Sequence, residues 1–172
     1  MIKEYEEQKN KQAYNLHQSK KLYVKARAII FKDNKILLLK NINKKTGKIK
    51  YMLPGGAVEN NETIKNAAVR EALEEFGVNV KPIKCLGKKY YSLKTTYNNT
   101  EFVSKRVEYY YLCEHINDVL NAPFGVDGEF DDEDEINQKI SLSLNEFKTI
   151  KPSQINHVTN KTFNKIIECF KI

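Results

Sequence analysis

Three glutamates in one short segment have the spacing to bind a metal ion together. Glu71, Glu74 and Glu75 lie three and four positions apart in a stretch with the period of an amphipathic helix. On a helix this spacing places the carboxylates on one side, where they repel one another unless a cation lies between them. Carboxylate oxygens favour Mg²⁺, with Mn²⁺ as the alternative. The segment therefore predicts a divalent-metal site or, as the simpler alternative, an acidic helix face exposed to solvent.

The segment has the start and stop signals of a helix. Thr63 is a candidate N-cap, and we expect the helix to run to Phe76 and end at Gly77, a residue suited to the left-handed C-terminal position. Apolar residues fill the arc beside the glutamates: Ala68, Val69, Ala72, Leu73 and Phe76. One side of the helix is thus predicted to pack on the domain while the other presents carboxylates.

A glycine pair precedes this helix. Gly55 and Gly56 follow a short apolar run that ends in Leu53-Pro54. Because glycine has no side chain, a phosphate or a metal ion can approach the backbone closely there. We expect a tight loop that brings a ligand to the helix.

The loop and the helix together match a longer pattern. Starting at Gly56, Glu62 follows after five residues and Arg70-Glu71 after seven more, and the segment closes with Ala72, Glu74-Glu75 and Gly77-Val78. This spacing resembles the Nudix box, G-x5-E-x7-R-E-U-x-E-E-x-G-U, in which U is aliphatic, and every fixed position is present. Many members have glycine just before the first glutamate. Asn61 stands there instead, and asparagine tolerates the left-handed conformation that a glycine would supply.

The resemblance to Nudix hydrolases implies a fold and a reaction. The implied fold class is α/β, an α/β/α sandwich with a mixed central β-sheet and a loop-helix-loop motif. The implied reaction is metal-dependent cleavage of a nucleoside diphosphate linked to another moiety, such as a modified nucleoside triphosphate, ADP-ribose or a nucleotide sugar. A hydrolase acting on RNA 5′ ends and a catalytically silent nucleotide-binding or regulatory module are the alternatives. The intact set of charged box residues argues against a silent module.

The resemblance also implies roles for single residues. Glu71, Glu74 and Glu75 would be metal ligands and catalytic groups, and the carbonyl of Gly55 a further metal ligand. Gly56 would lie against the substrate. The structural pair Arg70 and Glu62 would orient the helix.

The base that activates water lies, in this family, either on the box helix or on a glutamate carried by a distant loop. The longest and most acidic connection in the chain is 115–138, which suits the second alternative. Glu129, between Gly128 and Phe130, is our first candidate base, and Glu133 and Glu135 are the alternatives. The simpler interpretation is a solvated acidic loop that repels anions.

Arg27 and Glu108 are charged residues inside predicted strands. Two branched apolar runs around Asp33-Asn34 predict a β-hairpin, and Arg27 lies in the first of them. We expect Arg27 either at the surface or in a pocket, where its planar donor fork would bind the phosphate or base of a substrate. Glu108 lies in the second of two long segments that flank Asn98-Asn99, and we expect it to form a cross-strand ion pair.

The ends of the chain are less regular. Residues 1–21 predict either a short helix on the domain or a loose arm, and we treat them as an N-terminal extension to a single domain at 22–172. A last strand is expected at 139–144, followed by a short helix capped by Asn145 and by a C-terminal amphipathic helix.

Composition limits the partners and the compartment. The net charge is +7 although 127–135 is strongly acidic, so the rest of the chain could steer a polyanionic substrate, or lysine is simply a common surface residue here. Three scattered cysteines and no long apolar run predict a reduced, cytoplasmic protein without a membrane segment. We expect a small-molecule nucleotide substrate. Dispersed lysines argue against nucleic acid as the main partner, and a homodimer remains open.

Overall fold

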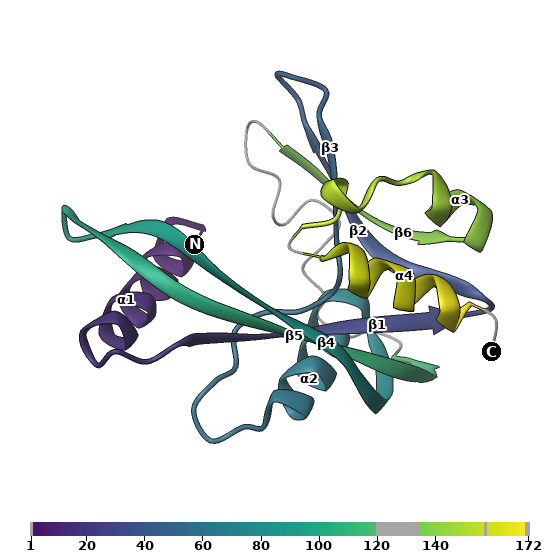
Figure 1. Ribbon diagram of the computed structural model, residues 1–172, viewed down its shortest axis with the longest axis horizontal. Coiled ribbons are helices and arrows are strands. Elements are labelled where there is room, and N and C mark those ends of the chain that lie inside the picture. Colours follow the sequence, from purple (N-terminus) through teal and green to yellow (C-terminus); the bar gives the residue numbers. More distant parts are fainter. Residues whose placement is uncertain (1, 120–134, 157, 171–172) are drawn as a thin grey trace.

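The computed structural model describes residues 2–119, 135–156 and 158–170. Within these residues a mixed six-stranded sheet lies between helices (Figure 1). The elements in chain order are α1 (Ile2–Gln18), β1 (Tyr23–Lys32), β2 (Lys35–Asn43), β3 (Ile49–Met52), α2 (Ile64–Phe76), β4 (Val78–Tyr97), β5 (Thr100–Asp118), β6 (Glu135–Leu142), α3 (Leu144–Thr149), the 3₁₀ turn η1 (Pro152–Gln154) and α4 (Asn160–Cys169).

The sheet has the strand order β3-β2-β1-β5-β4, and β6 pairs with β2 outside this order. β1 and β5 are parallel, whereas the other pairs are antiparallel. β1 pairs with β2 only next to their hairpin turn, at Phe31 and Lys32. Farther back, Ala28 and Ala26 donate their backbone N–H groups to the carbonyls of Pro54 and Gly56, at 2.8 and 3.0 Å. The glycine loop therefore runs beside β1 where β2 has diverged.

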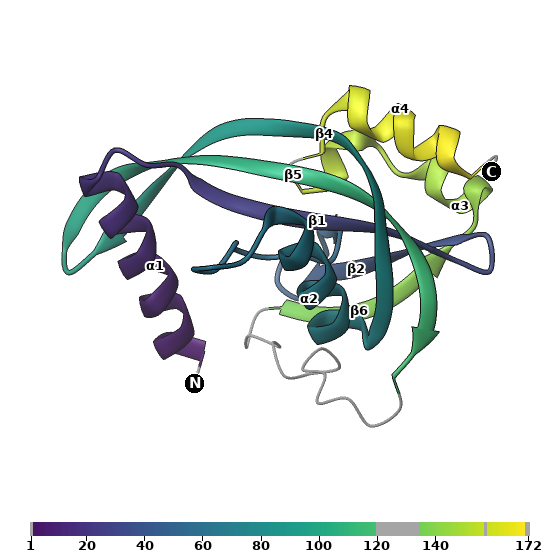
Figure 2. The same ribbon diagram turned by 90° about the horizontal axis from the view of Figure 1, so that it is seen from below.

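Each face of the sheet is covered by helices, as Figure 2 shows for α2 on one side and for α3 and α4 on the other. Ala26, Ala28 and Ile30 of β1 pack against the small residues Ala68 and Ala72 of α2, which allow the helix to approach closely. The opposite core joins strands to the C-terminal helices and contains Ile29, Leu112, Tyr110, Phe147, Phe163, Ile166 and Phe170. The α/β/α arrangement predicted from the sequence is confirmed.

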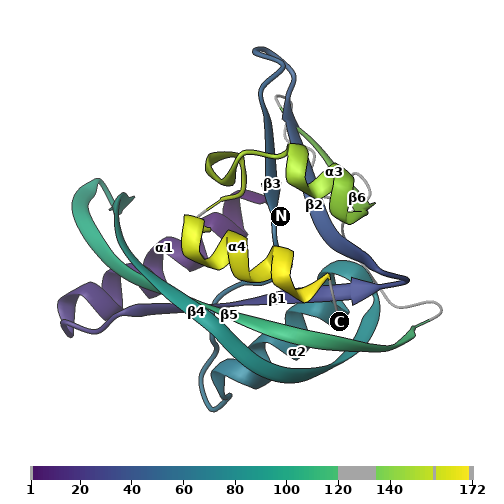
Figure 3. The same ribbon diagram turned by 45° about the vertical axis from the view of Figure 1, so that its right-hand side comes forward.

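The β4–β5 hairpin extends well beyond the last residue pair between β1 and β5, Tyr23 and Arg106. Helix α1 covers this extension, at the end of the molecule away from α3 and α4 (Figure 3). Tyr14 packs its ring against Tyr97 and Phe102, with centroids 5.4 and 5.5 Å apart, and Ala13 is buried beside them. Of the two alternatives for residues 1–21, the helix on the domain is the one observed.

The boundaries of the last strand and of the helix after it differ from the prediction. β6 begins at Glu135 rather than at residue 139, because it pairs with β2 along its whole length from Glu135 to Leu142. The connection expected at 115–138 is shorter at both ends, since β5 continues to Asp118. Ser143 rather than Asn145 caps α3: the Ser143 hydroxyl accepts from the N–H of Glu146, whose carboxylate accepts from the N–H of Ser143.

Helix α2 has the predicted limits. The Thr63 hydroxyl accepts a hydrogen bond from the N–H of Asn66 at 3.1 Å, and Gly77 has a left-handed backbone with φ 72°. Asn61 also has positive φ, 68°, as expected for an asparagine in place of a glycine. Among the helices in the described residues, none has the length and apolar character needed to cross a membrane.

Candidate active site

The glycine pair is fixed by close contacts on both sides of the loop. Gly55 has φ 146°, and a Cβ added there would lie 2.1 Å from the carbonyl oxygen of Ala26. A Cβ added at Gly56 would lie 2.1 Å from a carboxylate oxygen of Glu71. Any side chain at either position would thus displace β1 or a box glutamate. The loop needs glycine because it is packed between β1 and α2.

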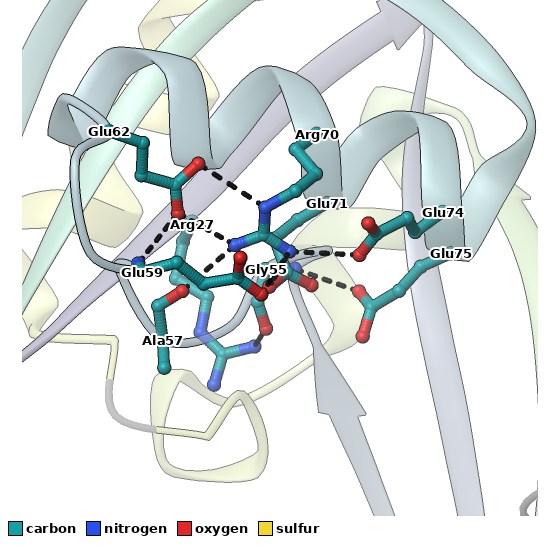
Figure 4. A network of polar contacts seen from close by, with 9 residues as sticks. All are labelled: Arg27, Gly55, Ala57, Glu59, Glu62, Arg70, Glu71, Glu74 and Glu75. Atoms are coloured by element: carbon teal, nitrogen blue, oxygen red, sulfur yellow. Dashed lines mark hydrogen bonds and ion pairs between the residues drawn. The ribbon is translucent and has the colours of Figure 1, made fainter. Parts of the chain in front are cut away.

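Arg70 connects the loop to three glutamates of the box. Its Nε and Nη2 donate to the two carboxylate oxygens of Glu62 at 3.2 and 2.9 Å, and Nη2 also donates to the carbonyl of Ala57 at 2.9 Å. Nη1 contacts both Glu71 and Glu74 at 2.9 Å (Figure 4). The pair of Arg70 with Glu62 is as predicted. The contacts with Glu71 and Glu74 were not predicted, although the i, i+4 spacing of Arg70 and Glu74 signals one of them.

Glu71 and Glu75 are carboxylates in a poorly hydrated environment. Burial raises the pKa of Glu71, against the opposing effect of Arg70. Burial also raises the pKa of Glu75 to about 7, against the opposing effect of Arg27. The N–H of Gly55 donates to Glu75 at 2.8 Å, which fixes this carboxylate over the loop. A cation bound between them would offset the cost of keeping both groups charged.

The three predicted metal ligands lie on the same side of α2 but do not meet at one point (Figure 4). Within the described residues, no group of three or more His, Cys, Asp or Glu side chains is arranged to hold a metal ion. Glu74 is turned toward Arg70 instead. The oxygen-only donor set and the raised pKa values of Glu71 and Glu75 nevertheless fit a hard divalent cation.

Arg27 lies beneath the glycine loop. Its guanidinium donates to the carbonyls of Leu53, at 3.1 Å, and Gly55. The other side of the guanidinium contacts the fully buried carboxylate of Glu108 at 3.3 Å. Burial alone would lower the pKa of Arg27, but the nearby carboxylates, chiefly Glu108, raise it overall. Arg27 therefore supports the loop from below, which is neither of the two places expected for it, the surface and a substrate pocket. One lone pair of the Gly55 carbonyl, expected to bind metal, is already used by Arg27.

Glu108 forms the predicted cross-strand ion pair and several further contacts. It lies 3.7 Å from Nζ of Lys25 on the neighbouring strand, and it accepts hydrogen bonds from the hydroxyls of Tyr91 and Tyr110 at 3.0 and 3.3 Å. Burial lowers the pKa of Lys25 to about 7, and Arg27 acts in the same direction while Glu108 opposes them. A single buried carboxylate thus balances two cations under the loop.

A cavity of about 420 Å³ opens beside the loop and the helix. Gly55 and Gly56 line one side of it beside Glu71 and Glu75, and Glu6 of α1 is a third lining carboxylate. Other walls come from α1, from the start of β1 and from the β4–β5 hairpin. Two of the three box carboxylates predicted to do chemistry, Glu71 and Glu75, therefore face a space that a small ligand can enter, whereas Glu74 does not line it.

The candidate bases on the acidic connection lie mostly beyond what the structure describes. Glu129 and Glu133 fall outside the described residues. Glu135 is the first residue of β6, where its carboxylate accepts a hydrogen bond from the Asn41 amide at 2.8 Å. It is not among the described residues that line the cavity.

A sequence model of the NUDIX domain matches residues 21–160. The chain belongs to the NUDIX family. Solved structures of similar fold agree: a NUDIX hydrolase from Nitrosomonas europaea superimposes with a TM-score of 0.57 at 23% identity, covering 88% of this chain and 89% of that one. An ADP-ribose pyrophosphatase from Streptococcus suis gives a TM-score of 0.54 at 18% identity, covering 87% and 92%. At this identity, the likeness shows the fold.

A closer but shorter sequence match is the ADP-ribose pyrophosphatase of Methanocaldococcus jannaschii. It is 51% identical to this chain over 59 residues. The match spans about a third of each protein, 34% of this chain and 34% of the relative.

Proposed function

We propose that this NUDIX protein is a divalent-metal-dependent hydrolase that cleaves the pyrophosphate linkage of a nucleoside diphosphate joined to another moiety. The observation that supports it most directly is the pair of poorly hydrated carboxylates, Glu71 and Glu75, facing a cavity across a glycine loop. An exposed acidic helix face, the simpler alternative, would have neither burial nor a facing cavity.

Mg²⁺, with Mn²⁺ as an alternative, would be held by Glu71, Glu74 and Glu75. When bound, such an ion neutralises charge on the phosphorus oxygens and lowers the pKa of an attacking water. The chain's own residues prepare the site. Gly55 and Gly56 line the cavity with backbone alone, which a phosphate group can approach closely. Arg27 fixes the loop, and Arg70 holds two glutamates in place.

Within this class we favour ADP-ribose, a nucleotide sugar or a modified nucleoside triphosphate as substrate. The Methanocaldococcus relative supports ADP-ribose through its name and through the matched third of its length. Action on RNA 5′ ends and a silent nucleotide-binding role are kept as outcomes of the test. Against a silent role, a site without chemistry gains nothing from holding like charges together at this spacing.

A hydrolysis panel tests the proposal. The wild-type protein is incubated with ADP-ribose, nucleotide sugars, nucleoside triphosphates and capped or triphosphorylated RNA, each with Mg²⁺, Mn²⁺ or EDTA. We expect one substrate group to be hydrolysed only with metal. On that substrate, Glu74→Gln and Glu75→Gln should each lose on the order of 10³ in kcat, about 4 kcal/mol of barrier.

The matched control is Glu168→Gln, the same substitution at an exposed position of α4. It should keep the wild-type rate. Near-native rates for both box variants would show that the site assignment is wrong. Binding of a nucleotide without hydrolysis of any substrate would support the silent module instead.

A further inference from the structure

Helix α1 lies outside the stretch matched by the family, which begins at residue 21, yet it forms one wall of the active-site cavity. Lys9 and Asn10 of α1 line this cavity together with the box carboxylates Glu71 and Glu75. The wall is anchored, because Ala13 on the same helix is buried against the hairpin. The cavity of this chain is therefore completed by a segment that the family pattern does not include.

Arg106 of β5 lies on another wall of the same cavity. Its guanidinium packs on the ring of Tyr23 at 4.8 Å, and it donates to the hydroxyls of Ser104 and Thr95 at 3.1 and 3.4 Å. These partners orient the guanidinium but carry no charge. Among the chain's three arginines, Arg27 and Arg70 contact carboxylates, whereas no ion pair joins Arg106 to a carboxylate of the described residues.

Lys9 brings a further cation to this space, in addition to Lys25 and Lys94. Burial lowers the pKa of Lys9, and the negative charges of Glu71 and Glu75 are the leading opposing effects, which shows that the ammonium lies near the box. The cavity thus has an acidic side on α2 and a second side on α1 and the β4–β5 hairpin, where Lys9, Lys94 and Arg106 outnumber the one carboxylate, Glu6. A ligand that fits both sides would carry negative charge beyond the part held at the carboxylates.

We propose that Lys9 and Arg106 bind the phosphate groups of the substrate that extend beyond the linkage to be cleaved, so that α1 selects substrates with a chain of three or more phosphates. A guanidinium presents a planar fork that matches two phosphate oxygens, and an ammonium adds a mobile point charge. A nucleoside triphosphate would use both sides of the cavity, whereas a diphosphate ending in a neutral sugar would leave Arg106 without an anion. The selection of substrates by α1 rests on the proposed hydrolysis, whereas the binding of an anion by Lys9 and Arg106 does not depend on it.

The first experiment measures the anion site without metal or catalysis. Inorganic tripolyphosphate is titrated calorimetrically in EDTA into the wild-type protein, Lys9→Gln and Arg106→Gln. Because a hydrogen bond to a charged group contributes about 10-fold or more to binding, we expect each variant to bind at least about 10-fold more weakly. Arg106→Lys keeps the charge but loses the fork, and it should fall between wild type and Arg106→Gln.

Matched controls come from the same two elements. Lys11→Gln on α1 and Lys105→Gln on β5 remove the same charge at exposed positions that do not line the cavity among the described residues. Both should bind tripolyphosphate within about 2-fold of wild type, since distant surface charges contribute little. Equal losses in the control and cavity variants would mean a diffuse charge effect and would overturn the site. Unchanged binding in both cavity variants would overturn it as well.

The second experiment concerns selection. For wild type and both cavity variants, kcat/KM is compared between ATP and ADP-ribose, which share a nucleoside and differ beyond the second phosphate. We expect the ratio of ATP to ADP-ribose to fall about 10-fold or more in each variant, through KM rather than kcat. An unchanged ratio would overturn the selection by α1. If the wild-type protein hydrolyses neither compound nor any panel member, the proposed hydrolysis fails, and the calorimetric result still decides the anion site.

Discussion

The buried ion pair beneath the glycine loop makes a sharp prediction about stability. Glu108 is fully buried, and Arg27 is almost so. In Glu108→Gln the shape of the side chain is kept, but Arg27 remains charged, because the pKa of an arginine is far above neutrality and the Glu75 carboxylate still raises it. Lys25, with a pKa of about 7 that Glu108 helps to keep up, can lose its proton. The variant therefore leaves a buried guanidinium without its main counter-charge.

The size of the effect follows from the partners that remain. Removing one member of a buried ion pair costs about 3–5 kcal/mol. Arg27 would keep the carbonyls of Leu53 and Gly55 and the more distant charge of Glu75, so we expect the lower end, about 3 kcal/mol. For a chain of this size that corresponds to a fall in Tm of about 6–12 °C.

The assay is urea and thermal unfolding of Glu108→Gln, Arg27→Met and the double variant, with Glu101→Gln as an exposed control on the same strand. If Arg27 and Glu108 act as a pair, the double variant should be more stable than the sum of the single losses by more than about 1 kcal/mol. Two results would refute the loop-supporting role. The first is that the losses of the single variants add up within about 0.5 kcal/mol in the double variant. The second is an Arg27→Met protein with wild-type stability and only a raised KM. The second outcome would indicate that Arg27 binds the substrate instead.

Three further predictions concern the box and its base. Gly56→Ala would place Cβ against the Glu71 carboxylate, so kcat should fall about 10²-fold with little change in circular dichroism. The control is Gly87→Ala, which should remain active because the nearest neighbour of its Cβ is the Thr162 hydroxyl at 3.3 Å. Arg70→Ala should lower the free energy of unfolding by about 1–3 kcal/mol because Glu62 loses a two-point partner, and wild-type stability in urea unfolding would contradict this. We further propose that the base lies on the acidic connection, and the variants that test it are Glu129→Gln, Glu133→Gln and Glu135→Gln. Measured for kcat against pH, one of the three should lose about 10²–10⁴-fold in kcat. Losses of only a few-fold in all three would assign the base to the box helix.

Features set by neighbouring residues could be predicted from the sequence. The limits of α2 depend on Thr63 and Gly77, whose cap contacts lie within one helical turn. The hairpin between β1 and β2 depends on Asp33 and Asn34, which both have positive φ. The glycine loop was predicted for another reason, the close approach of a ligand to the backbone, whereas in the structure glycine is needed at position 56 because Glu71 of the adjoining helix lies against it.

Features that depend on distant parts of the chain could not be predicted from the sequence. Arg27 and Glu108 are 81 positions apart and meet only because β1 and β5 are parallel neighbours, a pairing that no local pattern signals. The sequence therefore predicted that Glu108 would have an ion-pair partner without identifying it, and it left Arg27 between surface and pocket. The placement of α1 depends likewise on aromatic contacts with a hairpin almost ninety residues away, between Tyr14 and Phe102.

The position of Arg70 shows how the repulsion between the box carboxylates is reduced. Like charges on one helix face were the reason to predict a cation between them, and the structure places a guanidinium between Glu71 and Glu74. Arg70 therefore offsets part of the repulsion between these two carboxylates. Glu75 has no such contact with Arg70: its neighbours are the N–H of Gly55 and the charge of Arg27, and burial keeps its pKa near 7. A divalent ion would thus gain most at Glu75, whereas Glu71 and Glu74 would bind it with carboxylates that also contact Arg70.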